Sequence, residues 1–254
     1  MVGHFPDASG VAAGARDWAV MDFVAWPFAL GSRRRRAGNM GPRVLARKGC
    51  ALRIIETNTA PNPRRVRIFL AEKGISVPFE QRDLMAGELK TVGFTDINPM
   101  QRVPVLVLDD GTIISESVAI CRYFEEVQPE PALFGTGAVG KAIVEMWQRR
   151  AELGLFFHIA QAFRHLHPKM AHLEVPQIAP WGEANKDKAL DIMEIFDRQL
   201  GKERFVAGED YSIADITALV AIDFLKPAKI DMPCGLAGLE RWYREVSARP
   251  SALA

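Results

Sequence analysis

Residues 103–117 combine a strand headed by proline with a polar helix start, two features that together could bind a peptide. The apolar run opens with Val103-Pro104, turns at Asp110-Gly111 and ends in Ser115-Glu116-Ser117. A proline cannot donate to a strand ladder, so it lies at an edge or in a special turn and leaves the backbone of Val103 free to pair. At the helix start, unpaired N–H groups and the positive end of the dipole lie beside a hydroxyl and a carboxylate. The stretch therefore predicts a site for an extended peptide with a charged end group, such as glutathione.

The residues before this stretch predict a strand–helix–strand unit that would position it. Residues 52–55 form a short strand, and Asn62-Pro63 indicates a helix start with asparagine at the N-cap and proline at the first helical position. Gly74 ends that helix, and residues 75–82 hold a second strand. A weakly helical stretch over residues 87–97 precedes the hairpin, and a helix follows it. The apolar positions of that last helix are Ile120, Cys121, Phe124 and Val127. This order predicts a compact α/β unit with a mixed sheet.

The remainder of the chain is predicted to be helical. Prolines and glycines interrupt the pattern over residues 129–137, as a linker would. Helical patterns follow over residues 138–167, 181–200, from 211 onward and over 236–246. In the first of these the apolar positions are Ile143, Met146, Trp147, Leu153, Phe157 and Ala160. Ser212 and Asp215 form a variant of the capping box, with aspartate in place of glutamate. We therefore expect two domains, residues 51–128 and 138–254.

The first fifty residues differ in composition from the rest of the 254-residue chain. They carry eight Lys/Arg and three Asp/Glu without a sustained period, so we expect a disordered extension. Their apolar stretch is too short and too interrupted to span a bilayer. Residues 51–254 carry 24 basic and 28 acidic residues, which argues against nucleic acid as the main partner. The three cysteines are far apart and fit a reducing compartment, so we expect a cytoplasmic protein.

Four motifs, at their spacings, resemble the glutathione transferase superfamily. The matching stretches are PNPRRVRIFLAEKG (61–74), NPMQRVPVL (98–106), SESVAICRYFEE (115–126) and SIADI (212–216). The resemblance covers residues 51–254, about four fifths of the chain. It implies a thioredoxin-like first domain, an all-helical second domain and a homodimer.

The resemblance assigns roles to residues at both ends of the hairpin. In Val103-Pro104 the proline would be cis, and the valine backbone would pair with the cysteine of glutathione. Ser117 would bind the γ-glutamyl carboxylate through its N–H and hydroxyl, while Glu116 attracts the ammonium. Arg102 falls where the family often has a lysine that contacts the glycine carboxylate, with a solvated loop arginine as the alternative. Ser115 is expected to act mainly in capping the helix.

The thiolate of glutathione needs a stabilising group, because a free thiol with a pKa of about 8.5 is mostly protonated at neutral pH. Relatives use Tyr, Ser or Cys in the loop after the first strand, but the aligned position here is Ala60. Asn62 matches an asparagine that contacts the glutathione sulfur in the bacterial class resembling disulfide-bond oxidoreductases. Asn62 is therefore the predicted catalytic residue, with helix capping as its alternative role. Thr59 or a backbone N–H at the helix start is the alternative donor.

These assignments predict a glutathione transferase that uses the glutathione thiolate on a hydrophobic electrophile, a disulfide or a peroxide. Two alternatives stay open: a non-catalytic binding or scaffold module, which Ala60 favours, and a family isomerase or dehalogenase. Glutathione is the expected co-substrate, and aromatic side chains are candidates for the pocket of the second substrate. They are Phe156, Phe157, Phe163 and Trp181. No metal is expected, because His158 and His165 lack the spacing and the carboxylate of a zinc helix.

Overall fold

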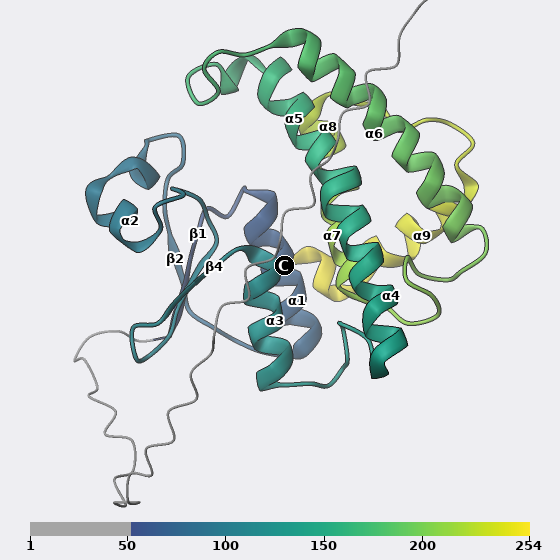
Figure 1. Cartoon of the computed structure of the whole chain (residues 1–254), viewed down its shortest axis with the longest axis horizontal. Coiled ribbons are helices and arrows are strands. Elements are labelled where there is room, and N and C mark those ends of the chain that lie inside the picture. Colours follow the sequence, from purple (N-terminus) through teal and green to yellow (C-terminus); the bar gives the residue numbers. More distant parts are fainter. Residues whose placement is uncertain (1–51) are drawn as a thin grey trace, which may run out of the picture. The chain divides into compact units, whose positions relative to one another are not determined.

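The computed structural model describes residues 52–254 (Figure 1). Over this range a small sheet with helices on both faces comes first, and a succession of helices follows. The predicted fold class, a thioredoxin-like α/β domain followed by an all-helical domain, is confirmed. The disordered extension expected for residues 1–50 lies outside the described range.

Four strands form the mixed sheet, in the order β2-β1-β3-β4. Their bounds are Arg53–Glu56 (β1), Phe79–Gln81 (β2), Val105–Val107 (β3) and Ile113–Ser115 (β4). β1 and β2 are parallel, whereas the β1–β3 and β3–β4 pairs are antiparallel. The β3–β4 hairpin turns at Gly111, whose φ of 85° is rare for a residue with a side chain. The strand expected over residues 75–82 is shorter than predicted, because Pro78 lacks the N–H that a longer ladder needs.

Different helices cover the two faces of the sheet. Their bounds are Pro61–Lys73 (α1), Val92–Ile97 (α2) and Ser117–Val127 (α3), with a 3-10 turn at Glu88–Lys90. α1 and α3 pack together, and Ile54 and Leu106 of the sheet share their core cluster. On the other face Ile55 packs in a smaller cluster with Phe94 of α2. Because side chains alternate along a strand, β1 supplies a core residue to each face.

The helical region begins at residue 137. Its α-helices are Gly137–Arg149 (α4), Phe157–Leu166 (α5), Ala179–Leu200 (α6), Ile213–Asp223 (α7), Leu225–Ala228 (α8) and Ala237–Ser247 (α9). Short 3-10 turns lie at Pro168–Met170 and Pro250–Leu253. None of the helices within residues 52–254 is both long and apolar enough to cross a membrane.

The helix predicted over residues 138–167 is present, but a π-helical segment, Arg150–Phe156, lies within it between α4 and α5. We refer to this segment as the π-helix. Of the predicted apolar positions Trp147 is buried, but others are exposed, namely Ile143, Met146, Leu153 and Phe157. Ile143 and Met146 each lie one position before a buried residue of α4, Val144 and Trp147, so the predicted apolar face is offset from the buried one before the π-helix begins. π turns are uncommon and frequently lie at functional sites.

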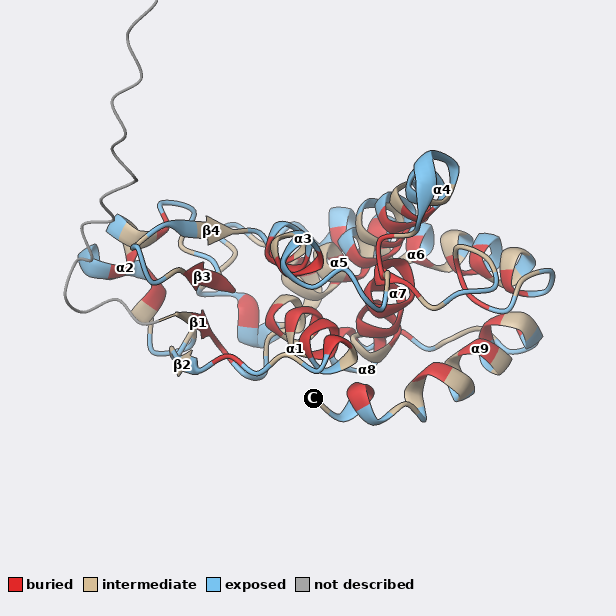
Figure 2. Ribbon diagram, turned by 90° about the horizontal axis from the view of Figure 1, so that it is seen from below, coloured by how far each residue is buried: buried red, intermediate tan, exposed pale blue. Residues whose placement is uncertain are grey.

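α7 is buried along nearly its whole length (Figure 2). Its N-cap is Ser212, whose N–H donates to the Asp215 carboxylate over 3.0 Å, and the predicted capping box is confirmed. The same carboxylate accepts hydrogen bonds from the Val206 N–H and the Trp242 indole N–H, each at 2.8 Å. Asp215 therefore ties the start of α7 to the loop before it and to α9.

Candidate functional site

Three segments of the chain meet at the edge of the sheet where β1 and β4 end and β3 begins. The register places Ile55 of β1 opposite Val105 of β3, and Val105 opposite Ser115 of β4. The residues that follow Ile55 and Ser115 therefore lie beside those that precede Val105. This places Val103-Pro104 next to Glu116, so two segments that the sequence predicts to bind a ligand are brought together.

The loop before β3 leaves a strip of backbone unpaired. The Val103–Pro104 peptide bond is cis, as predicted. Among the described residues, no backbone hydrogen bond joins Val103 to the sheet. Asn98 holds the loop, because its amide donates to the Arg102 carbonyl over 2.8 Å and its side-chain oxygen accepts from the Met100 N–H over 3.1 Å. The N–H and C=O of Val103 are thus available to an extended peptide.

Glu116 lies between β4 and α3 in a backbone conformation that side chains rarely adopt. It is the N-cap of α3, with φ of 70° and ψ of 117°. Strained residues of this kind cluster at functional sites, where the surrounding fold must offset the strain. Its side chain is exposed and has no ion-pair partner within residues 52–254. The capping role predicted for Ser115 is wrong, because Ser115 ends β4 in a pair with Val105.

Ser117, the first residue of α3, is buried against a cation. Its hydroxyl oxygen accepts a hydrogen bond of 2.7 Å from the guanidinium of Arg65 on α1. The same guanidinium nitrogen donates to the Glu152 carboxylate of the π-helix over 3.1 Å. Burial lowers the pKa of Arg65, although Glu152 opposes this shift. A buried positive charge therefore contacts the residue predicted to bind a carboxylate.

Polar contacts hold the loop between β1 and α1. The buried Glu56 carboxylate accepts from Arg67 and from Gln81, both at 2.7 Å. The Thr57 hydroxyl donates to the Arg82 carbonyl, also over 2.7 Å. These bonds tie the loop to β2 and keep the start of α1 close to the edge where β1 ends.

α1 begins two residues earlier than predicted, and Asn62 is not its N-cap. That position belongs to Ala60, whose side chain offers no hydrogen bond, and Pro61 is the first helical residue. Proline is tolerated throughout the first turn, where N–H groups lack helical partners, so the Asn-Pro pair indicated the wrong start. Because Pro61 and Pro63 have no N–H, Asn62 supplies the free backbone donor of this turn. Its side-chain amide is a second donor at the same place.

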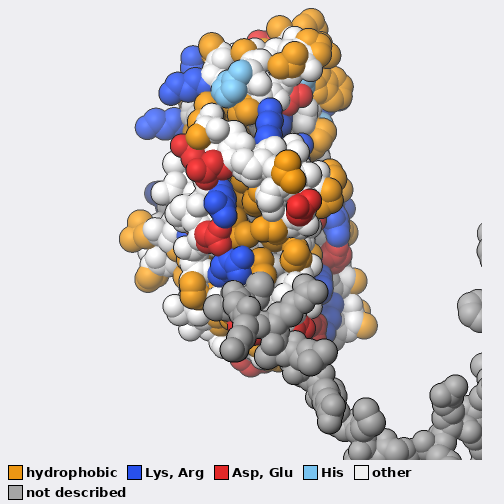
Figure 3. All heavy atoms as spheres, turned by 90° about the vertical axis from the view of Figure 1, so that its left-hand side faces the viewer, with side chains coloured by type: hydrophobic (Ala, Val, Ile, Leu, Met, Phe, Trp, Pro, Cys, Tyr) orange, Lys and Arg blue, Asp and Glu red, His pale blue; other side chains and the backbone are white. Residues whose placement is uncertain are grey.

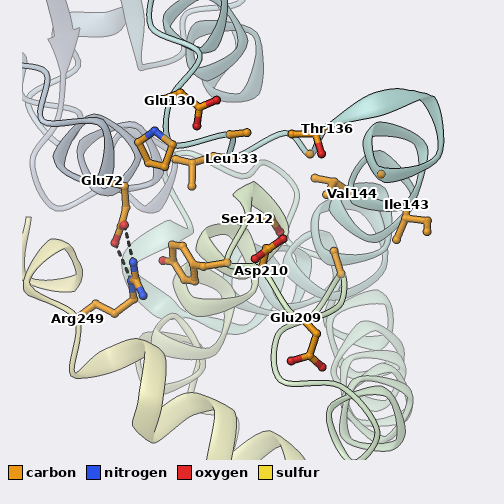
Figure 4. Close-up of a pocket in the computed structure, with 16 residues that line it drawn as sticks. Glu72, Glu130, Leu133, Thr136, Ile143, Val144, Glu209, Asp210, Ser212 and Arg249 are labelled. Atoms are coloured by element: carbon orange, nitrogen blue, oxygen red, sulfur yellow. Dashed lines mark hydrogen bonds and ion pairs between the residues drawn. The ribbon is translucent and has the colours of Figure 1, made fainter.

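Two hollows on the described surface differ in their relation to this edge. A groove of about 650 Å³ runs from Glu116 between α3 and α4. Its charged lining residues are Glu116, Arg122, Lys141, Glu145, Arg149 and Glu152. The other hollow, of about 480 Å³, contains the Glu72–Arg249 ion pair and lies beside α4 and the loop before α7 (Figure 4). None of the residues predicted to bind a ligand lines it, so the groove beside Glu116 is the one that continues the candidate site.

The aromatic candidates for a second-substrate pocket separate into two that pack against Phe224, namely Phe156 and Phe163, and two that are exposed. Phe156 is buried, and the Cζ atom of the Arg65 guanidinium lies over its ring, 5.4 Å from the ring centroid. Phe163 packs against Phe224 in the helical core, with ring centroids 5.0 Å apart. Phe157 and Trp181 remain exposed.

Arg65 contacts Ser117 of the candidate site, and Glu152 contacts Arg65, although neither residue was predicted to belong there. A signal was present, since Arg65 lies on the same helical stripe as the buried Ile68 and Phe69. A charged residue on an apolar stripe is almost never fully buried unless it is paired. Within residues 52–254 no group of His, Cys, Asp or Glu is arranged to hold a metal ion.

Comparison with known proteins gives matches along most of the described chain. The family model described as glutathione S-transferase, N-terminal domain, matches residues 59–127, and that of the C-terminal domain matches residues 146–250. Glutathione S-transferase 2 of Saccharomyces cerevisiae is 38% identical over 201 residues, which cover 78% of this chain and 86% of that protein.

Solved structures give the same result. The crystal structure of a glutathione S-transferase domain-containing protein from Marinobacter aquaeolei matches with a TM-score of 0.76 and 40% identity, over 78% of this chain and 98% of that chain. The crystal structure of Gtt2 from Saccharomyces cerevisiae matches with a TM-score of 0.76 and 38% identity, over 79% of this chain and 98% of that chain. The two family models together match residues 103–117 and most of the helical region.

Proposed function

The chain belongs to the glutathione S-transferase family, and we propose that it binds glutathione where Val103-Pro104 lies beside Glu116 and Ser117. The observation that carries the proposal is the juxtaposition of an unpaired strip of backbone with the start of α3. The amide groups of an extended tripeptide can pair with the free backbone, and its charged end can bind at the start of the helix.

Each part of glutathione meets a different group in this proposal. The Val103 backbone pairs with the cysteine residue. The N–H groups at the start of α3 and the Ser117 hydroxyl hold the γ-glutamyl carboxylate, and the exposed Glu116 attracts the ammonium. Arg102, exposed on the loop before β3, contacts the glycine carboxylate. Residues 51–128 would form this glutathione-binding domain, with a linker at 129–137 and the helical domain at 138–254.

The proposed reaction joins the glutathione sulfur to a hydrophobic electrophile. The same thiolate would reduce a disulfide or a peroxide. Forming a thiolate requires donors, because the pKa of a free thiol is about 8.5. Ala60 contributes no side-chain donor, whereas Asn62 offers a backbone N–H, an amide and the positive end of the α1 dipole. Asn62 is therefore the proposed catalytic residue, and Phe157 and Trp181 are the remaining aromatic candidates for contact with the electrophile.

Replacing Asn62 by alanine should slow conjugation about tenfold, the effect of one hydrogen bond to a charged group, and change glutathione affinity less. Asn62→Asp is the sharper test, because it keeps the shape but places a negative charge beside the sulfur. This variant should raise the pKa of bound glutathione and lose activity at neutral pH. The pH profile of kcat with saturating glutathione measures that pKa. Activity of Asn62→Asp equal to the parent would show that the amide does not face the sulfur, and Thr59 or a backbone N–H would then be the donor.

Retention on immobilised glutathione, followed by conjugation of chlorodinitrobenzene, tests the function itself. Retention with turnover supports the transferase. Retention without turnover supports the second candidate, a non-catalytic binding module, which the missing hydroxyl at Ala60 favours. A protein that is not retained contradicts both. A family isomerase or dehalogenase would be retained and would transform its second substrate without leaving sulfur on the product.

We further propose that the protein acts as a cytoplasmic homodimer without a metal ion. α4 and the π-helix leave apolar side chains exposed that a second copy would cover. They are Val139, Ile143, Met146 and Leu153. On the face shown in Figure 3, basic and acidic side chains are interspersed with apolar ones. Residues 51–254 carry 24 basic and 28 acidic residues, and this balance supports the proposal that nucleic acid is not a partner.

A further inference from the structure

Arg65 is a buried cation whose N–H groups are only partly satisfied. Its side chain has no exposed surface. Nη1 donates both of its hydrogen bonds, to the Ser117 hydroxyl oxygen over 2.7 Å and to the Glu152 carboxylate over 3.1 Å. Nε and Nη2 are buried without a hydrogen-bond partner. The Phe156 ring offsets part of this cost through its π face. Unpartnered N–H groups on a buried charge raise the free energy of the folded protein, so their presence needs a functional explanation.

The neighbouring carboxylate is an incomplete counter-charge. The Glu152 side chain is 24% exposed to water and lies 3.7 Å from a second cation, Arg149. Both features weaken its attraction to Arg65. Two further acidic groups act on Arg65: the Glu116 carboxylate, which is exposed to water, and Cys121, which stays a neutral thiol because burial raises its pKa. The positive charge of Arg65 therefore acts at the start of α3, where the helix dipole also attracts an anion.

We propose that Arg65 is a positioning residue for the γ-glutamyl carboxylate of glutathione, acting through the Ser117 hydroxyl and tuned by Glu152 of the π-helix. This inference rests on the proposed glutathione site. Because Arg65 donates to the Ser117 oxygen, the hydroxyl hydrogen is directed elsewhere and polarised, and it is free to bind the carboxylate. The bound carboxylate in turn supplies the counter-charge that Arg65 lacks in the free protein.

This arrangement makes affinity and stability respond to substitution in opposite directions. Without Arg65 the free protein no longer holds an undercompensated buried charge, so its melting temperature holds or rises while glutathione affinity falls. Without the charge of Glu152 the free protein retains a bare buried cation, so its melting temperature falls while glutathione affinity rises. A residue that only supports the fold would change both quantities in the same direction.

Calorimetric titration with glutathione and thermal unfolding of the ligand-free protein test the proposal. Arg65→Met should weaken binding by about tenfold or more, the effect of one charge-assisted contact, without lowering the melting temperature. Arg65→Lys, which keeps the charge, should recover part of the affinity. Glu152→Gln should bind glutathione more tightly and melt at a lower temperature. Glu194→Gln is the control, because Glu194 pairs with the exposed Arg198 on α6 and does not line the groove beside Glu116.

Cysteinylglycine, the dipeptide that lacks the γ-glutamyl group, tests whether Arg65 acts on the γ-glutamyl carboxylate or on the binding of the whole peptide. Its affinity should be the same for Arg65→Met and the parent. In a Ser117→Ala background the effect of Arg65→Met on glutathione should disappear. Equal losses for both peptides, additive effects of the two substitutions, or a lower melting temperature with unchanged affinity would each overturn the role of Arg65. A parent protein that does not bind glutathione would overturn the proposed site as well, which distinguishes the two failures.

Discussion

Replacing Asp215 by alanine is expected to lower the free energy of unfolding by about 3–5 kcal/mol, because it removes the acceptor of a buried hydrogen-bond network. The carboxylate is fully buried and accepts from Val206, Ser212 and Trp242. Alanine would leave these donors buried and unpaired, each at a cost of roughly 1–3 kcal/mol. Urea unfolding followed by circular dichroism measures the loss.

Ser212→Ala is the matched control for this prediction. It removes a hydroxyl 3.0 Å from the same carboxylate but keeps the backbone donors, so about 0.5–2 kcal/mol should be lost. Glutathione affinity of the folded Asp215→Ala protein should equal that of the parent, because Asp215 joins α7 to α9 and makes no hydrogen bond to the residues proposed to bind glutathione. An unchanged melting temperature together with lost turnover would instead place Asp215 in the chemistry.

The same carboxylate should make stability depend on pH. Burial raises the pKa of Asp215 from 3.8 to about 6, although its hydrogen bonds act in the opposite direction. Between these values the folded protein holds the proton more tightly than the unfolded chain does. The contribution of this group to stability is therefore complete below the unfolded pKa and is lost as the pH rises through the folded pKa. Melting curves between pH ~4 and ~7 should show this decline in the parent and not in Asp215→Asn; equal pH dependence of the two proteins would contradict the assignment.

Ser117→Ala should weaken glutathione binding by about fivefold to 150-fold, the equivalent of roughly 1–3 kcal/mol for a hydrogen bond to charge. The substitution removes the hydroxyl that would bind the γ-glutamyl carboxylate and also the acceptor of the Arg65 bond. Calorimetric titration measures the dissociation constant, and circular dichroism checks that the fold is intact. Ser115→Ala is the control, because it removes a hydroxyl two residues away that belongs to β4. A dissociation constant unchanged by Ser117→Ala would show that glutathione binds elsewhere.

Features that depend on residues close in sequence were predictable. The β3–β4 hairpin follows from Asp110-Gly111, because the turn needs a residue with positive φ. The capping box at Ser212 and Asp215 follows from a spacing of three residues. The order of elements then implies the mixed sheet, and its register sets Val103 beside Glu116.

Element boundaries were less predictable, because the same local chemistry fits several positions. Two prolines in the first turn of α1 made Asn62 a plausible N-cap, and the choice of Ala60 depends on how the loop after β1 is tied to β2. Similarly, an apolar period cannot show where a helix widens. The π-helix, Arg150–Phe156, was therefore invisible in the pattern of residues 138–167.

The contact of Arg65 with Ser117 and Glu152 is a product of tertiary structure alone. These partners are 52 and 87 residues away from Arg65 in the chain, on α3 and on the π-helix. The helical period of α1 places Arg65 on the buried side, which shows that its charge needs a partner but does not identify it. Local sequence decides which face of a helix is buried, whereas the packing of α1 against α3 and the helical domain decides which groups compensate a charge on that face.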